Sequence, residues 1–268
     1  MMRFLVALLL LPIQALADDW PQELLDLARL DEMTEVIIAE GLADNATMPE
    51  DYIGISIPGS WSKELERIYD PAVLNDLVTR EFLARSETLD PVHTRSYLQS
   101  SAWQETLNFE LEARYALMDP SVADAALAYY WERFEAGDKR LDVLDRLVAQ
   151  SSLVEGNVIG AMNSMYQFEL GLIDGGLDLG FTEDELLQQI WAEEESLRYD
   201  VSEWVYSFLL FAYDPVPNRD IKAQIDFFDT RNGRIFNAAL FGAFDRAYEQ
   251  ISYELGKALA EVAQEQTL

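Results

Sequence analysis

Repeated helix-start signals constrain the fold of this chain more than any other feature. Proline directly follows aspartate at Pro71, Pro91 and Pro120, and Pro21 stands two residues after Asp19. An aspartate N-cap accepts hydrogen bonds from the free N–H groups of a first helical turn, and proline is favoured at the first helical positions. Each of these four places therefore predicts the start of a helix.

Strand signals are scarce in comparison. Few runs of β-branched residues alternate with polar residues in the way that predicts a half-buried strand. A further helix start is indicated by Thr182 and Glu185, whose spacing is that of a capping box. We therefore predict an all-α protein that folds as a helical bundle.

The last long segment carries one stripe of apolar residues at steps of three and four, which is the spacing of one helix face. The residues of this stripe are Phe236, Leu240, Phe244, Ala247, Ile251, Leu255 and Leu259. We expect all of them to be buried. The small residues beside the stripe, where another helix could approach closely, are Ala238, Ala239, Gly242 and Ala243.

Short segments recur in the two halves of the chain, 130 residues apart. The matching pairs are GLAD (41–44) with GLID (171–174), WSKELERIYD (61–70) with WAEEESLRYD (191–200), and YLQSSAWQ (97–104) with FFDTRNGR (227–234). The steps of the final stripe also recur at Leu107, Leu111, Tyr115 and Met118. We predict two tandem, divergent helical copies, residues 18–137 and 138–268.

The stretch FFDTRNGR holds several polar residues, but its spacing does not fit a metal loop. An EF-hand needs oxygen ligands at alternate positions and a glutamate six residues after its glycine, where this chain has Ala239. Thr230 and its counterpart Ser100 are residue types that cap a following helix. We interpret the stretch as a structural corner between two helices.

The corner residues also carry a family resemblance. An aromatic pair, a Ser or Thr, a Gly and an Arg at this spacing resemble the signature of a bacterial exported family catalogued as domain of unknown function number 2059; they are Phe227, Phe228, Thr230, Gly233 and Arg234. The resemblance is best over residues 190–260. In the first copy Leu98 replaces the second aromatic residue and Trp103 replaces the glycine. The resemblance implies a helical fold and export, and it implies no particular activity.

The N-terminus predicts export. Residues 1–17 place Arg3 before a short apolar run and end in Ala15-Leu16-Ala17, a pattern that signal peptidase accepts. We expect this signal peptide to be removed and the mature chain, which has no transmembrane segment, to reside in a bacterial periplasm. The chain contains no cysteine, so a packed core must stabilise it without disulfides.

The charge of the chain is strongly negative. It has 49 acidic and 19 basic side chains, which give a net charge of −30, spread evenly over both halves. Such a charge repels nucleic acid and anionic lipid. It fits either a basic or metal-ion partner or a surface that keeps the protein in solution.

Residue types for the common catalytic and metal sites are few. His93 is the single histidine, which leaves zinc sites and Ser-His or Cys-His triads short of members. Ser60 and Lys63 match a Ser-x-x-Lys pair, but its partner motifs are absent and the serine is placed to cap a helix. We predict no catalytic residue, no metal ligand and no cofactor.

Carboxylates remain as a chemical resource. A glycosidase pair or a calcium site needs only Asp and Glu. Glu193, Glu194 and Glu195 are followed by Asp200 and Glu203, but consecutive acids point to different faces of a helix and are typical of a solvated surface. The segment 174–185, DGGLDLGFTEDE, is the better calcium candidate, although it lacks the alternating ligand register.

Aromatic residues crowd the segment 191–213. They favour either core packing or a ligand groove between the two copies. The candidate ligand-binding residues are Trp191, Tyr199 and Trp204.

Three functions are open from the sequence. The first is a non-enzymatic protein-interaction module of the cell envelope, because duplicated helices without catalytic residues resemble a scaffold and another envelope protein is then the expected partner. The second is a carrier of a small apolar ligand in an aromatic-lined groove. The third, ranked last, is a carboxylate-dependent hydrolase.

Overall fold

The computed structural model describes residues 19–177, 180 and 182–265, and every regular element in them is a helix, which confirms the all-α prediction. The signal-peptide prediction lies outside the described residues. The helices of the first half are α1 (Trp20–Ala28), α2 (Leu30–Asp44), α3 (Met48–Ile53), α4 (Trp61–Ile68), α5 (Pro71–Ser86), α6 (Pro91–Leu98), α7 (Ser101–Leu117) and α8 (Pro120–Glu135). Those of the second half are α9 (Lys139–Ser151), α10 (Leu153–Asp174), α11 (Glu183–Ala192), α12 (Glu194–Ala212), α13 (Asn218–Phe228) and α14 (Arg231–Glu265).

The helix starts follow from the aspartate caps. Asp70 accepts hydrogen bonds from two backbone N–H groups of the first turn of α5, and Asp90 caps α6 in the same way. Asp119 accepts from the backbone N–H of Ser121 at the start of α8. The capping box of Thr182 and Glu185 opens α11. Asp19 stands at the N-cap of α1 but its side chain makes no capping bond.

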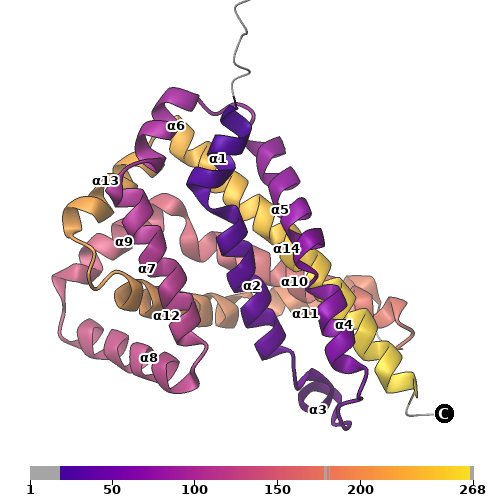
Figure 1. The fold of residues 1–268 in the computed structure, drawn as a ribbon. Helices are drawn as coiled ribbons and strands as arrows, with labels where there is room; N and C mark the ends of the chain where they lie inside the picture. Colours follow the sequence, from indigo (N-terminus) through magenta and orange to yellow (C-terminus); the bar gives the residue numbers. More distant parts are fainter. Residues whose placement is uncertain (1–18, 178–179, 181, 266–268) are drawn as a thin grey trace, which may run out of the picture.

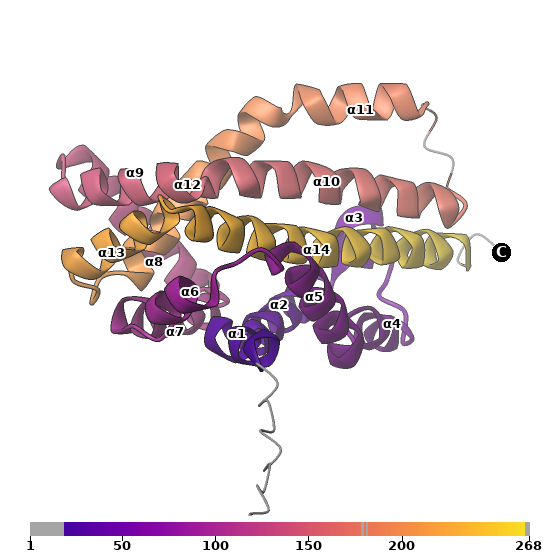
Figure 2. The same cartoon turned by 90° about the horizontal axis from the view of Figure 1, so that it is seen from above.

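The helices are arranged in layers around α14. Figure 2 shows α11 outermost, then α10, then α14, and on the far side of α14 the helices α1, α2, α4 and α5. Seen from the front, α14 runs diagonally through the whole molecule and α7, α8 and α12 lie to one side of it (Figure 1). The main core therefore includes residues of both halves, among them Phe82, Trp103 and Phe236.

Helices α10 and α14 touch backbone to backbone. A Cβ atom on Gly171 would lie 2.1 Å from the carbonyl oxygen of Tyr253, and one on Gly256 would lie 2.1 Å from that of Phe168. Because no side chain fits at either position, glycine on both helices is what allows this close packing.

The predicted apolar stripe of α14 is buried at five of its seven positions. Leu240 and Phe244 are the exceptions, since both are only part-buried. Of the small residues beside the stripe, Ala239 and Ala243 are fully buried, and α5 covers this face. The side chain of Arg85 from α5 lies so close to Gly242 that a Cβ there would be 2.4 Å from its Nε atom.

The stretch FFDTRNGR forms the corner between α13 and α14. The hydroxyl of Thr230 donates to the carbonyl oxygen of Phe227 at 2.7 Å and accepts from the N–H of Gly233 at 2.9 Å. A Cβ on Gly233 would lie 2.0 Å from the carbonyl oxygen of Phe227, so the corner cannot hold a larger residue there. Phe227 and Phe228 are buried. At the surface, the guanidinium group of Arg234 donates a hydrogen bond to the carbonyl oxygen of Asp229.

Over the described part of the chain, none of the helices combines the length and apolar character that a membrane crossing requires.

The glycine contact of α10 and α14 gives a stability prediction. Gly256→Ala places a methyl group against the backbone of α10, so we expect it to lower the free energy of unfolding by about 3 kcal/mol or more. Gly59→Ala is the matched control, because a Cβ at Gly59 meets nothing within 4 Å. Urea unfolding followed by circular dichroism measures both. Equal effects of the two substitutions would contradict the role of this contact.

Candidate functional site

A cavity of about 750 Å³ lies between the two halves of the chain. Helices α2 and α7 of the first half line one side, and α10, α12 and α14 of the second half line the other. Its walls are mainly apolar, with residues such as Leu107, Leu111, Phe208, Leu240, Phe241 and Phe244. The two stripe residues of α14 that are only part-buried, Leu240 and Phe244, are thus wall residues of this cavity.

A second cavity of about 450 Å³ lies next to the first and is also lined by α2 and α14. The two cavities share the lining residues Ile37, Glu40, Ser164 and Tyr248. We call the two together the central groove. On α14 the lining residues of the two cavities run from Asn237 to Leu255, a distance of roughly 27 Å at about 1.5 Å per helical residue.

The lining of the main cavity includes a chain of polar groups. The hydroxyl of Tyr213 is hydrogen-bonded to Oε1 of Glu110 and lies 3.1 Å from Oε1 of Gln224. The Nε2 atom of Gln224 donates to the carbonyl oxygen of Ala102 at 3.3 Å. Tyr213 and Gln224 are buried, and Glu110 is a part-buried residue in the lining of the main cavity.

The hydroxyl of Tyr213 lies between two acceptor oxygens, Oε1 of Glu110 and Oε1 of Gln224. A phenol has one proton, so Tyr213 cannot donate to both at the same time. Burial raises the pKa of Glu110, against the opposing effects of the Tyr213 hydrogen bond and of Arg114.

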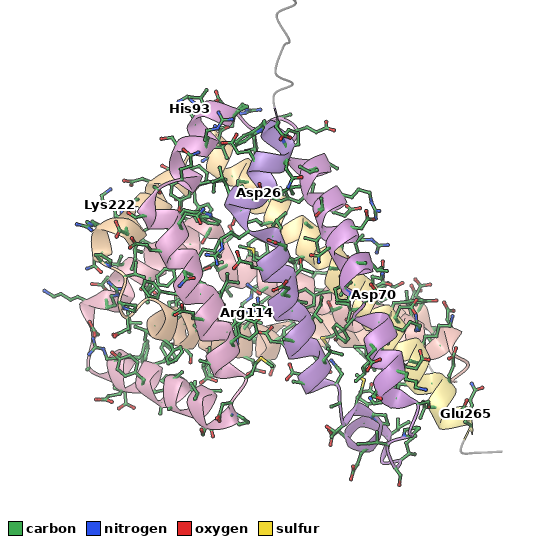
Figure 3. All side chains as sticks on the ribbon, viewed as in Figure 1. Asp26, Asp70, His93, Arg114, Lys222 and Glu265 are labelled. Carbon is green, nitrogen blue, oxygen red and sulfur yellow. The ribbon has the colours of Figure 1, made fainter. Side chains whose placement is uncertain are left out.

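An ion pair crosses the groove where its two cavities meet. Arg114 of α7 donates from Nε and Nη2 to the two carboxylate oxygens of Glu40 on α2, the first at 2.8 Å. Its Nη2 atom also lies 3.5 Å from the hydroxyl of Tyr248 on α14. Figure 3 shows Arg114 in the middle of the molecule, whereas His93 and Lys222 lie at its outer edge. The guanidinium charge is therefore neutralised within the fold.

Asp245 of α14 is a second carboxyl group in the groove wall. Burial raises its pKa to about 6, the neighbouring Glu249 adds to this rise, and Arg85 opposes it. A Cβ on Gly160 of α10 would lie 2.7 Å from Oδ1 of Asp245, so the glycine leaves the space that the carboxyl group occupies. Asp245 takes part in none of the ion pairs found among the described residues.

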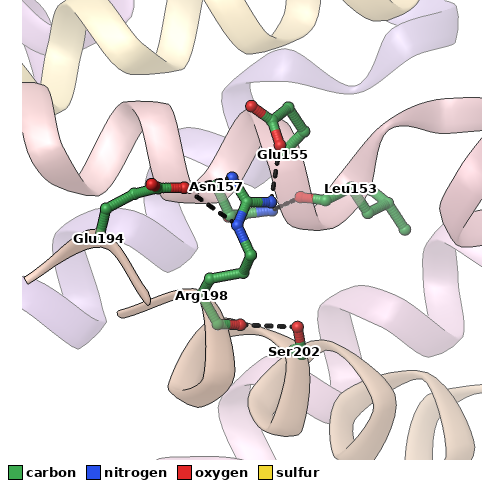
Figure 4. Close-up of polar contacts among 6 residues, drawn as sticks. All are labelled: Leu153, Glu155, Asn157, Glu194, Arg198 and Ser202. Carbon is green, nitrogen blue, oxygen red and sulfur yellow. Dashed lines mark hydrogen bonds and ion pairs between the residues drawn. The ribbon is translucent and has the colours of Figure 1, made fainter. Parts of the chain in front are cut away.

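The α12 wall is attached to α10 by Arg198. Its guanidinium group donates to Glu194 and reaches across to Glu155 at 2.7 Å (Figure 4). Nearly two turns further along α12, the ring of Trp204 stacks on that of Phe208, with centroids 5.5 Å apart and an interplanar angle of 8°. Both rings line the groove.

The three aromatic residues proposed from the sequence are thus placed differently. Trp204 lines the groove and is 50% exposed. Tyr199 and Trp191 are 57% and 66% exposed and do not line it. The hydroxyl of Tyr199 instead lies 3.4 Å from Glu203 on the same helix.

Of the other chemical candidates from the sequence, Asp200 lines the main cavity, whereas the described remainder lie apart from the groove. The side chain of His93 is 78% exposed and its Nδ1 atom is 3.3 Å from Asp90. Asp174 accepts a hydrogen bond from Tyr253, and residues 178, 179 and 181 of the calcium candidate lie outside the described residues. Within the ranges that the structure describes, no three His, Cys, Asp or Glu side chains are grouped as metal ligands would be.

Sequence reasoning missed three groove residues, Glu110, Gln224 and Asp245. A signal existed for one of them. Glu110 stands between Leu107 and Leu111 on the apolar stripe of its helix, and a carboxyl group on such a face is costly unless it is neutral or partnered.

Comparisons of the chain with protein-family models, with curated proteins and with solved structures found no match. The family resemblance of the corner residues therefore stays a prediction from the motif.

Asp245 gives a pH-dependent prediction. Its pKa in the folded protein lies above that of an unfolded aspartate, so the folded state binds more protons between these values and the free energy of unfolding falls as pH rises through that window. The substitution Asp245→Asn removes the titrating carboxyl group, and with it this loss of stability at higher pH. We expect the variant to be more stable than the wild type by about 1–2 kcal/mol at pH near 7.5 and equally stable at pH near 4. Urea unfolding at the two pH values measures this, and a difference that does not change with pH would contradict it.

Proposed function

We propose that this protein binds a small apolar ligand in the central groove and is not an enzyme. The observation that carries the proposal is the groove itself, since its main cavity has the volume and the apolar, aromatic lining of ligand pockets in proteins. Part-exposed Leu240, Phe241 and Phe244 support it, because apolar side chains that face an open cavity in the free protein gain most from a bound apolar partner.

We further propose that the groove lies between two divergent copies of one helical unit. Each half opens with a helix pair joined through a residue with left-handed backbone, Arg29 (φ 55°) and Ser152 (φ 52°). Contacts between the halves also support it. At the offset of 130 residues α5 corresponds to α12 and α7 corresponds to α14. The contact of α5 with α14 therefore has its counterpart in the contact of α12 with α7. Tyr97 and Phe227, at matching places in the two corners, stack with ring centroids 3.8 Å apart.

The proposed address of this carrier is the bacterial periplasm. It rests on the signal-peptide pattern of residues 1–17 and on the resemblance of the corner residues to an exported family. An exported carrier would hold an apolar molecule away from water between membranes.

A protein-interaction module remains the second candidate, and one surface favours it. Trp191 and Leu187 on α11 and Ile159 on α10 are 66%, 38% and 48% exposed. These two helices contact each other, so the exposed residues lie on neighbouring elements. In-cell crosslinking that recovered no partner would count against this candidate.

The groove proposal predicts a difference between two tryptophans. Trp204→Ala removes a large aromatic side chain from the lining of the groove. We therefore expect it to weaken binding of the neutral apolar dye N-phenylnaphthylamine about tenfold, or about 1.4 kcal/mol. Trp191→Ala is the matched control, because Trp191 is exposed but does not line the groove. Dye fluorescence measures the affinity and circular dichroism checks the helix content. Dye binding that both substitutions leave unchanged would remove the proposal.

A further inference from the structure

We propose that the natural ligand of the central groove is an amphiphile with an elongated apolar body and one protonated amine that pairs with Asp245. This inference rests on the proposed ligand-binding function and names the chemical class of the ligand. Three observations carry it: the charges that line the groove, the nature of its walls and its shape.

The charges that line the groove are unbalanced. The main cavity is lined by four carboxyl groups and one cation, Arg114. Arg114 is already held by Glu40 through two hydrogen bonds, so this pair offers no free positive charge. Asp200 and Asp245 remain without an ion pair among the described residues. A carboxylate ligand would therefore meet uncompensated negative charge, whereas an ammonium group would complete a pair.

The position of Asp245 makes it the partner of the ammonium group. It is part-buried in the groove wall, whereas Asp200 is exposed at the outer side. Phe241 and Phe244 precede it on the same helix and also line the groove. Aromatic faces next to a carboxylate suit a hydrophobic cation, because the ring quadrupole also attracts positive charge.

The shape of the groove sets the form of the apolar body. The main cavity alone follows α14 from Asn237 to Tyr248, which is about three helical turns at about 3.6 residues per turn. An unbranched chain or another narrow body fits such a space better than a compact one. Glu110, Tyr213 and Gln224 add hydrogen-bonding groups to its lining.

The surface charge acts in the same direction. With a net charge of −30, the protein attracts cations and repels anions before they reach the groove. This long-range effect is common to all surface acids, so the experiment must separate it from the pairing at Asp245.

The pairing also gives a pH dependence. Asp245 is faced by Glu249 on its own helix and by Arg85 from α5, and Glu40, Arg114 and Tyr248 line the same groove. An alkylamine has a pKa near that of the lysine side chain, about 10, so it stays protonated below that pH. We expect amine binding to tighten as pH rises through about 6, where Asp245 ionises.

The test uses three ligands of equal chain length, decylamine, decanol and decanoate, as competitors of bound N-phenylnaphthylamine at concentrations below micelle formation. We expect decylamine to compete at least about tenfold more strongly than decanoate, with decanol between them. Asp245→Asn should remove most of the advantage of decylamine over decanol. Asp142→Asn, an exposed aspartate on α9, changes the net charge by the same amount and should leave that advantage intact.

Two results overturn the inference. Decanoate that competes as well as decylamine contradicts the cationic class, and equal effects of Asp245→Asn and Asp142→Asn contradict the pairing. Either result leaves the proposed ligand-binding function of the groove intact, provided that the dye still binds and that Trp204→Ala still weakens dye binding. If neither the dye nor decylamine binds, with decylamine measured directly by calorimetry, the groove function and this inference both fail.

Discussion

The close contact of α10 with α14 is the constraint on which the rest of the structure depends. Glycine at Gly171 and Gly256 brings the two backbones together, and α14 then serves as the axis that both halves of the chain cover. Helix α5 packs on one face of this axis and α10 on another. These contacts join residues far apart in the sequence, so the main core contains residues of both halves.

The groove follows from how the same two helices meet at their other ends. There α10 again presents glycines, Gly156 and Gly160, but α14 presents side chains instead. A Cβ on Gly156 would lie 2.6 Å from the ring of Phe241, and one on Gly160 would lie 2.7 Å from Asp245. The space that the glycines leave is therefore filled by two groove residues. One helix pair thus provides a closed contact at one end and a ligand-accessible wall at the other.

The fold class was predictable from the sequence, whereas the lining of the groove was predictable only in part. Aspartate caps and a capping box act within one helical turn, so they fixed where helices begin. The stripe of α14 predicted burial correctly where another helix covers it and wrongly at Leu240 and Phe244, because periodicity does not distinguish a core from a cavity. Trp204 was found by aromatic crowding alone. Glu110 and Asp245 come together only through tertiary packing, which no local pattern records.

The central claim is that the groove holds a ligand, and native mass spectrometry of the chain purified gently from its own host tests it most directly. The account predicts an excess mass that is lost on denaturation and that corresponds to a small apolar molecule with a basic nitrogen. A chain that is bare as purified, and that stays bare after incubation with decylamine, would contradict the claim.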